Sequence, residues 1–214
     1  VDVDNEFYGI LIADATTAGI ETDYASIAIW ADSNGKFLFA GDNDQTTLTT
    51  LTAVNSSGAQ NVACMVNTFL RSDGTGIDVW NDVMGYADVS FASTILGKRI
   101  GSYTTIYKNL KGMKPDNFTS TEITAIENLN GCHYMTTYGK DMTEGGRVTD
   151  GGALGTGEWI DIEIGIDWLE VRMQEAVFQT ITSVDKIPYT DKGTTIIETA
   201  VNGVLETGVN YGLL

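Results

Sequence analysis

The sequence predicts an α/β fold, in which a mostly parallel β-α-β-α-β core sheet is flanked by helices and followed by a two-helix C-terminal segment. The first half alternates strand and helix patterns, and the last third repeats apolar residues at helical steps. Strands that alternate with helices imply a parallel sheet with right-handed crossovers. The 214 residues are expected to form a single α/β core of a larger protein, with a possible subdivision into residues 1–96 and 97–214.

The first half is expected to hold three strands and three helices. The strands are predicted at residues 7–13, 36–40 and 61–70, and the helices at residues 22–33, after residue 44, and at residues 77–93. Four apolar residues recur at helical spacing in the first helix, which Gly35 can close: Tyr24, Ile27, Ala28 and Ala31. Asp44 can cap the second helix, whose expected inward face is Leu48, Leu51 and Val54.

The middle of the chain has a looser pattern. A strand is expected at residues 103–110, and Pro115 then marks a break. Thr121 can cap a helix over residues 122–129, and another strand is expected at residues 132–138. Residues 141–157 hold six glycines and are predicted to form an exposed loop or a hairpin.

Residues 160–184 carry two conflicting patterns. Isoleucine alternates with polar residues at the start, which is typical of a strand, but the apolar repeat at three- and four-residue steps continues long enough to favour a helix. This helix would be apolar on two sides, with one stripe made of Ile162, Ile166, Leu169, Met173, Ala176, Val177, Ile181 and Val184 and the other of Ile160, Ile164, Trp168, Val171 and Phe178. It is therefore either a central helix inside one domain or a helix with one side against another subunit.

Pro188 ends this helix, and a last helix is expected to follow. Its predicted inward residues are Ile196, Ile197, Ala200, Val201, Val204, Leu205 and Val209. The chain begins at Val1 without a methionine, which suggests a processed or truncated polypeptide.

The composition opposes several classes of partner and site. The net charge of −17 argues against nucleic acid and against an anionic membrane surface, because phosphate binding needs clustered Lys and Arg. No run of apolar residues is long enough for a membrane-spanning helix, so membrane insertion is not expected. Cys64 and Cys132 lie in apolar runs and are expected to be buried thiols. His133 is the single histidine, which removes most zinc sites, and it is expected to be buried in a strand.

The sharpest enzyme motif is Asp42-Asn43-Asp44-Gln45-Thr46, which directly follows a predicted strand. Mg²⁺-dependent phosphohydrolases place a D-x-D-x-T there, where Asp42 would attack phosphorus and Asp44 would handle the leaving-group proton. Gly41, however, separates the strand from Asp42, and Lys98, the candidate lysine, follows a helix. The alternative is an acidic turn that precedes a helix.

Two further features have simpler structural explanations. The glycine-rich residues 151–157 fit neither dinucleotide nor P-loop spacing, so a loop before a helix is expected. Asp161, Glu163, Asp167 and Glu170 are expected to form a solvated acidic stripe on one flank of the long helix. The sequence predicts no catalytic residue, no cofactor and no metal site.

Several stretches of the sequence resemble a known family. They are residues 157–161 (GEWID), 165–169 (GIDWL), 172–178 (RMQEAVF) and 186–193 (KIPYTDKG), with weaker similarity at residues 7–9, 28–31, 35–39 and 101–112. The chain resembles the contractile tail sheath proteins of bacteriophages, as a fragment that lacks the terminal arms. The resemblance implies a virion structural protein and no enzyme.

The resemblance also implies partners and a place in the cell. Subunits of this family form hexameric rings in a helical sheath around the tail tube, join a baseplate, and contract to drive the tube through the host envelope during genome ejection. Assembly would take place in the host cytoplasm, and the terminal arms link neighbours by adding strands to a sheet. The residues expected to contact other subunits are Gly151, Gly152, Glu158, Trp159, Asp161, Asp167, Trp168, Arg172 and Glu175.

Two other functions remain open on the sequence alone. One is the phosphohydrolase built on Asp42 and Asp44. The other is a monomeric binding module that presents residues 141–157 to a ligand.

Overall fold

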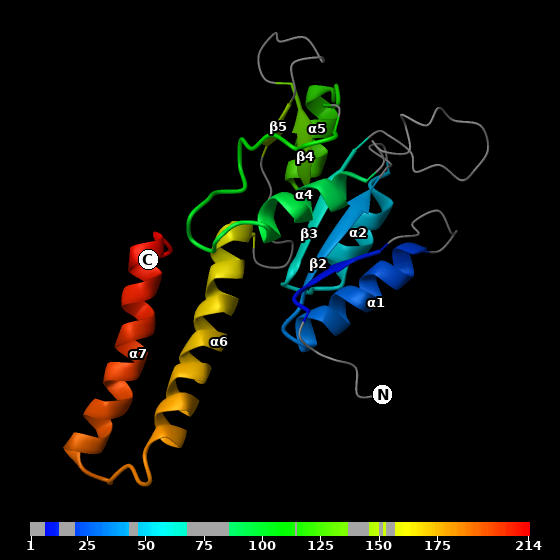
Figure 1. The fold of residues 1–214 in the computed structure, drawn as a ribbon. Helices are drawn as coiled ribbons and strands as arrows, with labels where there is room; N and C mark the ends of the chain where they lie inside the picture. The colour runs from blue at the N-terminus through cyan, green and yellow to red at the C-terminus, as the bar shows by residue number, and fades with distance from the viewer. Residues whose placement is uncertain are drawn as a thin grey trace. The chain divides into compact units, whose positions relative to one another are not determined.

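The computed structural model describes residues 7–12, 20–42, 47–67, 86–113, 115–136, 146–149, 152 and 157–214. Its elements, in chain order, are β1 (Gly9–Leu11), α1 (Ile20–Ser33), β2 (Phe37–Asp42), α2 (Thr49–Ser56), β3 (Val62–Val66), α4 (Ala87–Leu96), α5 (Ser120–Glu127), β4 (Cys132–Met135), β5 (Arg147–Thr149), α6 (Ile160–Ser183) and α7 (Asp191–Tyr211) (Figure 1). The chain divides into two compact units. The first comprises Val1–Gly97 and Thr105–Ile160, and the second comprises Lys98–Thr104 and Asp161–Leu214.

The first unit contains one five-stranded sheet in the order β1-β2-β3-β4-β5. The first four strands are parallel, with Leu38 of β2 opposite Val62 of β3, and β5 runs antiparallel to β4. The predicted α/β class with a mostly parallel sheet is therefore confirmed. Strands β1, β3 and β4 cover only part of the predicted ranges, whose ends lie partly outside the described residues, whereas β2 runs beyond the predicted residue 40 to Asp42.

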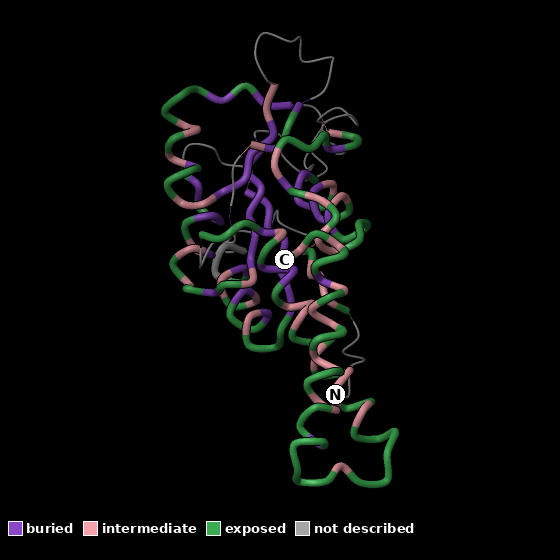
Figure 2. The backbone as a smooth tube through the Cα atoms, turned by 90° about the vertical axis from the view of Figure 1, so that its left-hand side faces the viewer, coloured by how far each residue is buried: buried purple, intermediate pink, exposed green. Residues whose placement is uncertain are grey.

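Helices cover both faces of this sheet. One core joins α1, α2 and α5 to alternate residues of β2 and β3, such as Leu38, Val62 and Cys64. Adjacent strand residues point to the opposite face, where Phe39 makes an edge-to-face contact with Phe91 of α4 at 6.2 Å between ring centroids. Figure 2 shows that many of the buried residues lie in the strands of the sheet.

Several predicted boundaries in the first unit were correct and others were wrong. The predicted inward residues of α1 and α2 are buried, except that Ile27 is only partly buried: Tyr24, Ala28, Ala31, Leu48, Leu51 and Val54. The predicted helix at residues 77–93 corresponds to α4, which ends at Leu96, while residues 68–85 lie outside the described part. Helix α5 is capped by Thr119, and not by Thr121, since Thr119 and Glu122 form a capping box.

The predicted strand at residues 103–110 is not formed. Tyr107 has a φ of 60°, a left-handed conformation that interrupts an extended chain. This segment still touches the sheet, because the Tyr107 N–H donates to the Val148 carbonyl at 2.7 Å and the Val148 N–H donates to the Lys108 carbonyl at 2.9 Å. Of residues 141–157, predicted as a loop or a hairpin, the described part includes β5, which pairs antiparallel with β4 outside this range.

The second unit is a helical hairpin with the short segment Lys98–Thr104. The 24 residues of α6 confirm the helix over the strand pattern, and residues 184–190 connect α6 to α7. The predicted inward residues of α7 are partly buried except Val209, which is exposed because it follows the buried Gly208 by one residue and so points about 100° away. No helix among the described residues combines the length and apolar character that crossing a membrane requires.

The last residues fold back onto the hairpin. The Leu213 N–H donates to the Gly208 carbonyl at 3.0 Å, and Gly212 closes α7 with a φ of 86°. The side chain of Leu213 packs directly against Gly101 and Gly165. A Cβ atom at either glycine would collide with Leu213. Glycine at both positions therefore allows the end of the chain to pack against α6 and the segment before it.

Candidate functional site

The Asp42 carboxylate of the candidate phosphohydrolase motif has a structural partner. Strand β2 runs through Asp42, so the expected separation of strand and Asp42 by Gly41 is wrong. Asp42 is 2% exposed, and its Oδ2 accepts the N–H of Leu51 in the first turn of α2 at 2.9 Å. The N-cap position is held by Leu48, whose side chain offers no oxygen. Asp42 thus supplies the acceptor that the helix start needs, and Asp44 lies outside the described residues.

The histidine and both cysteines are packing residues, as predicted. His133 is buried in β4 and makes an edge-to-face contact with Phe118 at 5.7 Å between ring centroids. Cys64 and Cys132 are buried free thiols. Burial, followed by the nearby charge of Asp42, raises the pKa of Cys64 well above its ordinary value, which disfavours a reactive thiolate. Among the described residues, no three His, Cys, Asp or Glu side chains are placed to hold a metal ion.

Gly152 of the glycine-rich segment lies against the residues that directly precede α6. Gly152 pairs with Trp159 in an isolated antiparallel bridge, and a Cβ at Gly152 would lie 2.5 Å from the Glu158 carbonyl oxygen. This close approach requires glycine at position 152. Glu158 and Trp159 are exposed, Trp159 to 43%, whereas residues 153–156 and Gly151 are outside the described part.

The acidic stripe expected at the start of α6 is only partly solvated. Glu163 is buried, Asp161 and Asp167 are partly buried, and Glu170 is exposed. The prediction was wrong for Glu163, because an acidic residue in the first turns of a helix can face the packed side. Burial raises the pKa of Asp161, opposed by the N–H groups at the helix start. Burial, with the charge of Asp161 as a second cause, raises the pKa of Tyr103 to about 12.

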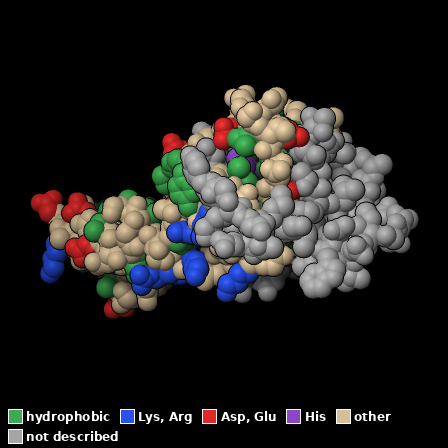
Figure 3. All heavy atoms as spheres, turned by 90° about the horizontal axis from the view of Figure 1, so that it is seen from above, with side chains coloured by type: hydrophobic (Ala, Val, Ile, Leu, Met, Phe, Trp, Pro, Cys, Tyr) green, Lys and Arg blue, Asp and Glu red, His purple; other side chains and the backbone are tan. Residues whose placement is uncertain are grey.

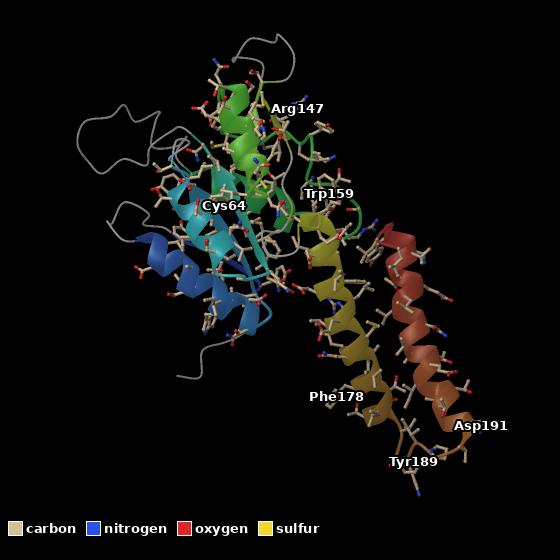
Figure 4. The ribbon with its side chains drawn as sticks, turned by 180° about the vertical axis from the view of Figure 1, so that it is seen from behind. Cys64, Arg147, Trp159, Phe178, Tyr189 and Asp191 are labelled. Atoms are coloured by element: carbon tan, nitrogen blue, oxygen red, sulfur yellow. The ribbon has the colours of Figure 1, made fainter. Side chains whose placement is uncertain are left out.

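Each of the two apolar stripes of α6 has members that pack against α7 and members that are exposed. Leu169 faces α7, since a Cβ at Gly208 would lie 3.4 Å from its Cδ2, and Trp168 packs against Tyr211 at 5.7 Å between ring centroids. Phe178 is 69% exposed and projects from the side of α6 that faces away from α7 (Figure 4). Several other apolar residues of α6 and its following loop are also exposed: Ile162, Ile166, Val171, Ile181, Val184 and Tyr189. Among the described residues, α6 is therefore not covered along its whole length.

The predicted contact residues gather in part around one groove. Trp168, Arg172 and Glu175 line it together with Lys98 and Arg99. Arg172 Nη1 lies 2.6 Å from Glu175 Oε2, and both side chains are more than half exposed. Glu158, Trp159, Asp161 and Asp167 are not among the residues that line this groove.

The hairpin exposes several large apolar side chains, and exposed apolar patches mark surfaces that contact other molecules. Residues 160–214, which are α6, the connecting loop and α7, match a family described as "E217 tail sheath protein gp31-like, C-terminal domain". No curated protein matches the chain. The match supports the resemblance to phage tail sheath proteins and a structural role in the tail of the virion. That family is structural and not enzymatic.

Proposed function

We propose that this chain is the core of a subunit of a contractile phage tail sheath. The subunits would polymerise in hexameric rings around the tail tube, join the baseplate, and contract to drive the tube through the host envelope. The subunit would assemble in the host cytoplasm, and terminal arms would link neighbouring subunits. The observation that carries the proposal is the match of the whole α6–α7 hairpin to the C-terminal domain of a tail sheath protein.

The geometry supports a role in contacts between subunits. Phe178 and Tyr189 expose large apolar surfaces on the hairpin, and such surfaces are costly to leave in water. Within the described residues, β1 is an edge strand of the sheet in the first unit. Its outer edge is available for pairing with a strand from a neighbouring subunit. A contractile polymer needs a stiff folded unit with several interfaces, and both features suit that need.

Four of the predicted contact residues are exposed and carry this part of the proposal. Glu158 and Trp159 directly precede α6, and Arg172 and Glu175 lie on α6. Trp and Arg are enriched at the centres of interfaces, where their truncation has the largest effect. We infer that Trp159 and Arg172 contact neighbouring subunits in the assembled sheath.

Negative-stain electron microscopy of the full-length protein, expressed alone and with its tail tube protein, tests the proposal. Rods or stacked rings of uniform diameter are expected, and their cross-section should show sixfold symmetry. Trp159→Ser and Arg172→Glu should shorten or abolish the rods without lowering the melting temperature by more than a few degrees. Dispersed particles in both expressions would contradict the proposed function.

A further inference from the structure

A groove on one side of the hairpin concentrates positive charge in a chain whose net charge is −17. We call it the basic groove; it has a volume of about 640 Å³, and its lining includes Lys98, Arg99, Trp168, Arg172, Glu175 and Tyr211. Three of the twelve Lys and Arg side chains of the protein line it, against the single carboxylate of Glu175. Figure 3 shows Lys and Arg side chains next to one another on the surface seen from above.

A cation–π contact holds one of these cations in place. The guanidinium carbon of Arg99 lies 4.4 Å from the centre of the Tyr211 ring, and Tyr211 packs in turn against Trp168. A guanidinium in a cation–π contact keeps its charge, and its N–H groups suit bidentate contact with a carboxylate. Arg99 is exposed, so these N–H groups can meet an incoming group.

The second arginine of the groove has a partner that an incoming carboxylate can replace. Arg172 and Glu175 are one helical turn apart at 2.6 Å, with side chains 53% and 57% exposed. Exposed pairs of this kind contribute little to stability, because water screens them. Arg172 also has more N–H donors than a single carboxylate uses. Together with Lys98, the groove offers a surplus of two positive charges over Glu175.

We propose that the basic groove docks a carboxylate-bearing surface of a second copy of this chain. The chain carries 29 Asp and Glu against 12 Lys and Arg, so two copies repel each other unless contacts place acidic groups against clustered cations. The groove provides such a cluster on a face that α6, α7 and the segment Lys98–Thr104 build within one unit. This inference rests on the proposed function only in assuming that the chain associates with itself.

Sedimentation velocity of the 214-residue chain tests the proposal. Reversible association is expected in low salt, at about 50 mM NaCl, and it should weaken steeply towards about 500 mM, where the screening length is only a few ångström. Arg172→Glu should lower the association constant by about tenfold or more. Lys192→Glu makes an equal change of charge at an exposed position of α7 outside the groove. It should lower the association constant by less than about threefold.

A variant with the opposite expected effect sharpens the test. Glu175→Gln removes the carboxylate that competes for Arg172 and should strengthen association more than Glu206→Gln, its control outside the groove. A zero-length carboxyl–amine crosslinker, applied to a mixture of isotope-labelled and unlabelled chains, should join Lys98 of one copy to an Asp or Glu of another. Arg172→Gln serves as the second groove variant where circular dichroism shows that Arg172→Glu is unfolded.

Three outcomes would overturn the inference. They are a wild-type chain that stays monomeric at every salt concentration, equal effects of Arg172→Glu and Lys192→Glu, and crosslinks of Lys98 confined to its own copy. A monomeric chain that binds only an added acidic protein would likewise show that the second copy is not the occupant. Sedimentation velocity tests whether the basic groove docks a second copy, whereas microscopy of the full-length protein tests whether it forms a sheath. Each proposal can therefore fail without the other.

Discussion

Asp42, the last residue of β2, accepts a hydrogen bond at 2.9 Å from the backbone N–H of Leu51 in the first turn of α2. The carboxylate is buried, and it meets a helix start whose own N-cap residue, Leu48, provides no side-chain acceptor. The partial positive charge of the helix N-terminus further stabilises this arrangement. Asp42, which the motif would make a nucleophile, therefore connects β2 to the start of α2 through a hydrogen bond.

We expect Asp42→Ala to lower the free energy of unfolding by about 1–3 kcal/mol, because the Leu51 N–H loses its buried acceptor. Urea denaturation followed by circular dichroism measures this change. Glu127→Ala, at an exposed position of α5, should change stability by less than about 0.5 kcal/mol. Equal stabilities of the two variants, or Mg²⁺-dependent turnover of a phosphate ester that Asp42→Asn abolishes, would contradict this assignment.

The capping box of α5 predicts a pH dependence. Glu122 accepts the backbone N–H of Thr119 at 2.7 Å and also its hydroxyl, and these hydrogen bonds lower the pKa of Glu122. A lowered pKa in the folded state means that the stabilisation is complete above the unfolded value of about 4.3 and is lost as the pH falls through the folded value. Stability of the wild type should therefore decrease more steeply between about pH 5 and about pH 3 than that of Glu122→Gln. Glu127→Gln is the control, and parallel curves for wild type and Glu122→Gln would refute the prediction.

The sequence was informative wherever periodicity was long. The apolar repeat after residue 160 predicted α6 against a competing strand pattern, and the apolar runs of β2 and β3 predicted strands. Short local patterns were less reliable. The Tyr- and Thr-rich residues 103–110 favour an extended chain locally, but Tyr107 adopts a positive φ where the segment meets β5. The cap at Thr119 was readable, since Glu122 follows it by three residues as a capping box requires.

The basic groove could not be predicted in the same way. Arg172 was expected at a contact, but nothing in local spacing brings Arg99 near a helix that begins only at Ile160. Their proximity depends on the fold of the second unit, in which Tyr211 at the end of α7 provides the ring that Arg99 contacts. The exposure of Phe178 is also a tertiary property, because the same stripe would be buried in a central helix.

The contact between Leu213 and Gly165 predicts a coupling between two substitutions. Alanine is favoured over glycine inside a helix by about 1 kcal/mol, but a Cβ at position 165 collides with the Leu213 side chain. Gly165→Ala should therefore stabilise the chain by about 1 kcal/mol in a Leu213→Ala background and fail to do so in the wild type. Gly203→Ala, which meets no atom within 4 Å, should stabilise both backgrounds alike. Thermal unfolding of the double-mutant cycle measures the coupling, and an additive result would disprove the contact.

Substitutions at Phe91 and Phe178 are expected to have separate effects, the first on folding stability and the second on assembly. Phe91 is buried against Phe39, so Phe91→Ala should lower the free energy of unfolding by about 3–5 kcal/mol. Phe178 is 69% exposed, so Phe178→Ser should change stability by less than about 0.5 kcal/mol, and yet it should shorten the rods of the full-length protein by removing apolar surface that a neighbour would cover. Val209→Ser, at an exposed apolar position of α7, is the control for rod length. Rods of unchanged length with Phe178→Ser, or rods shortened equally by Val209→Ser, would show that this side of α6 is not a specific contact.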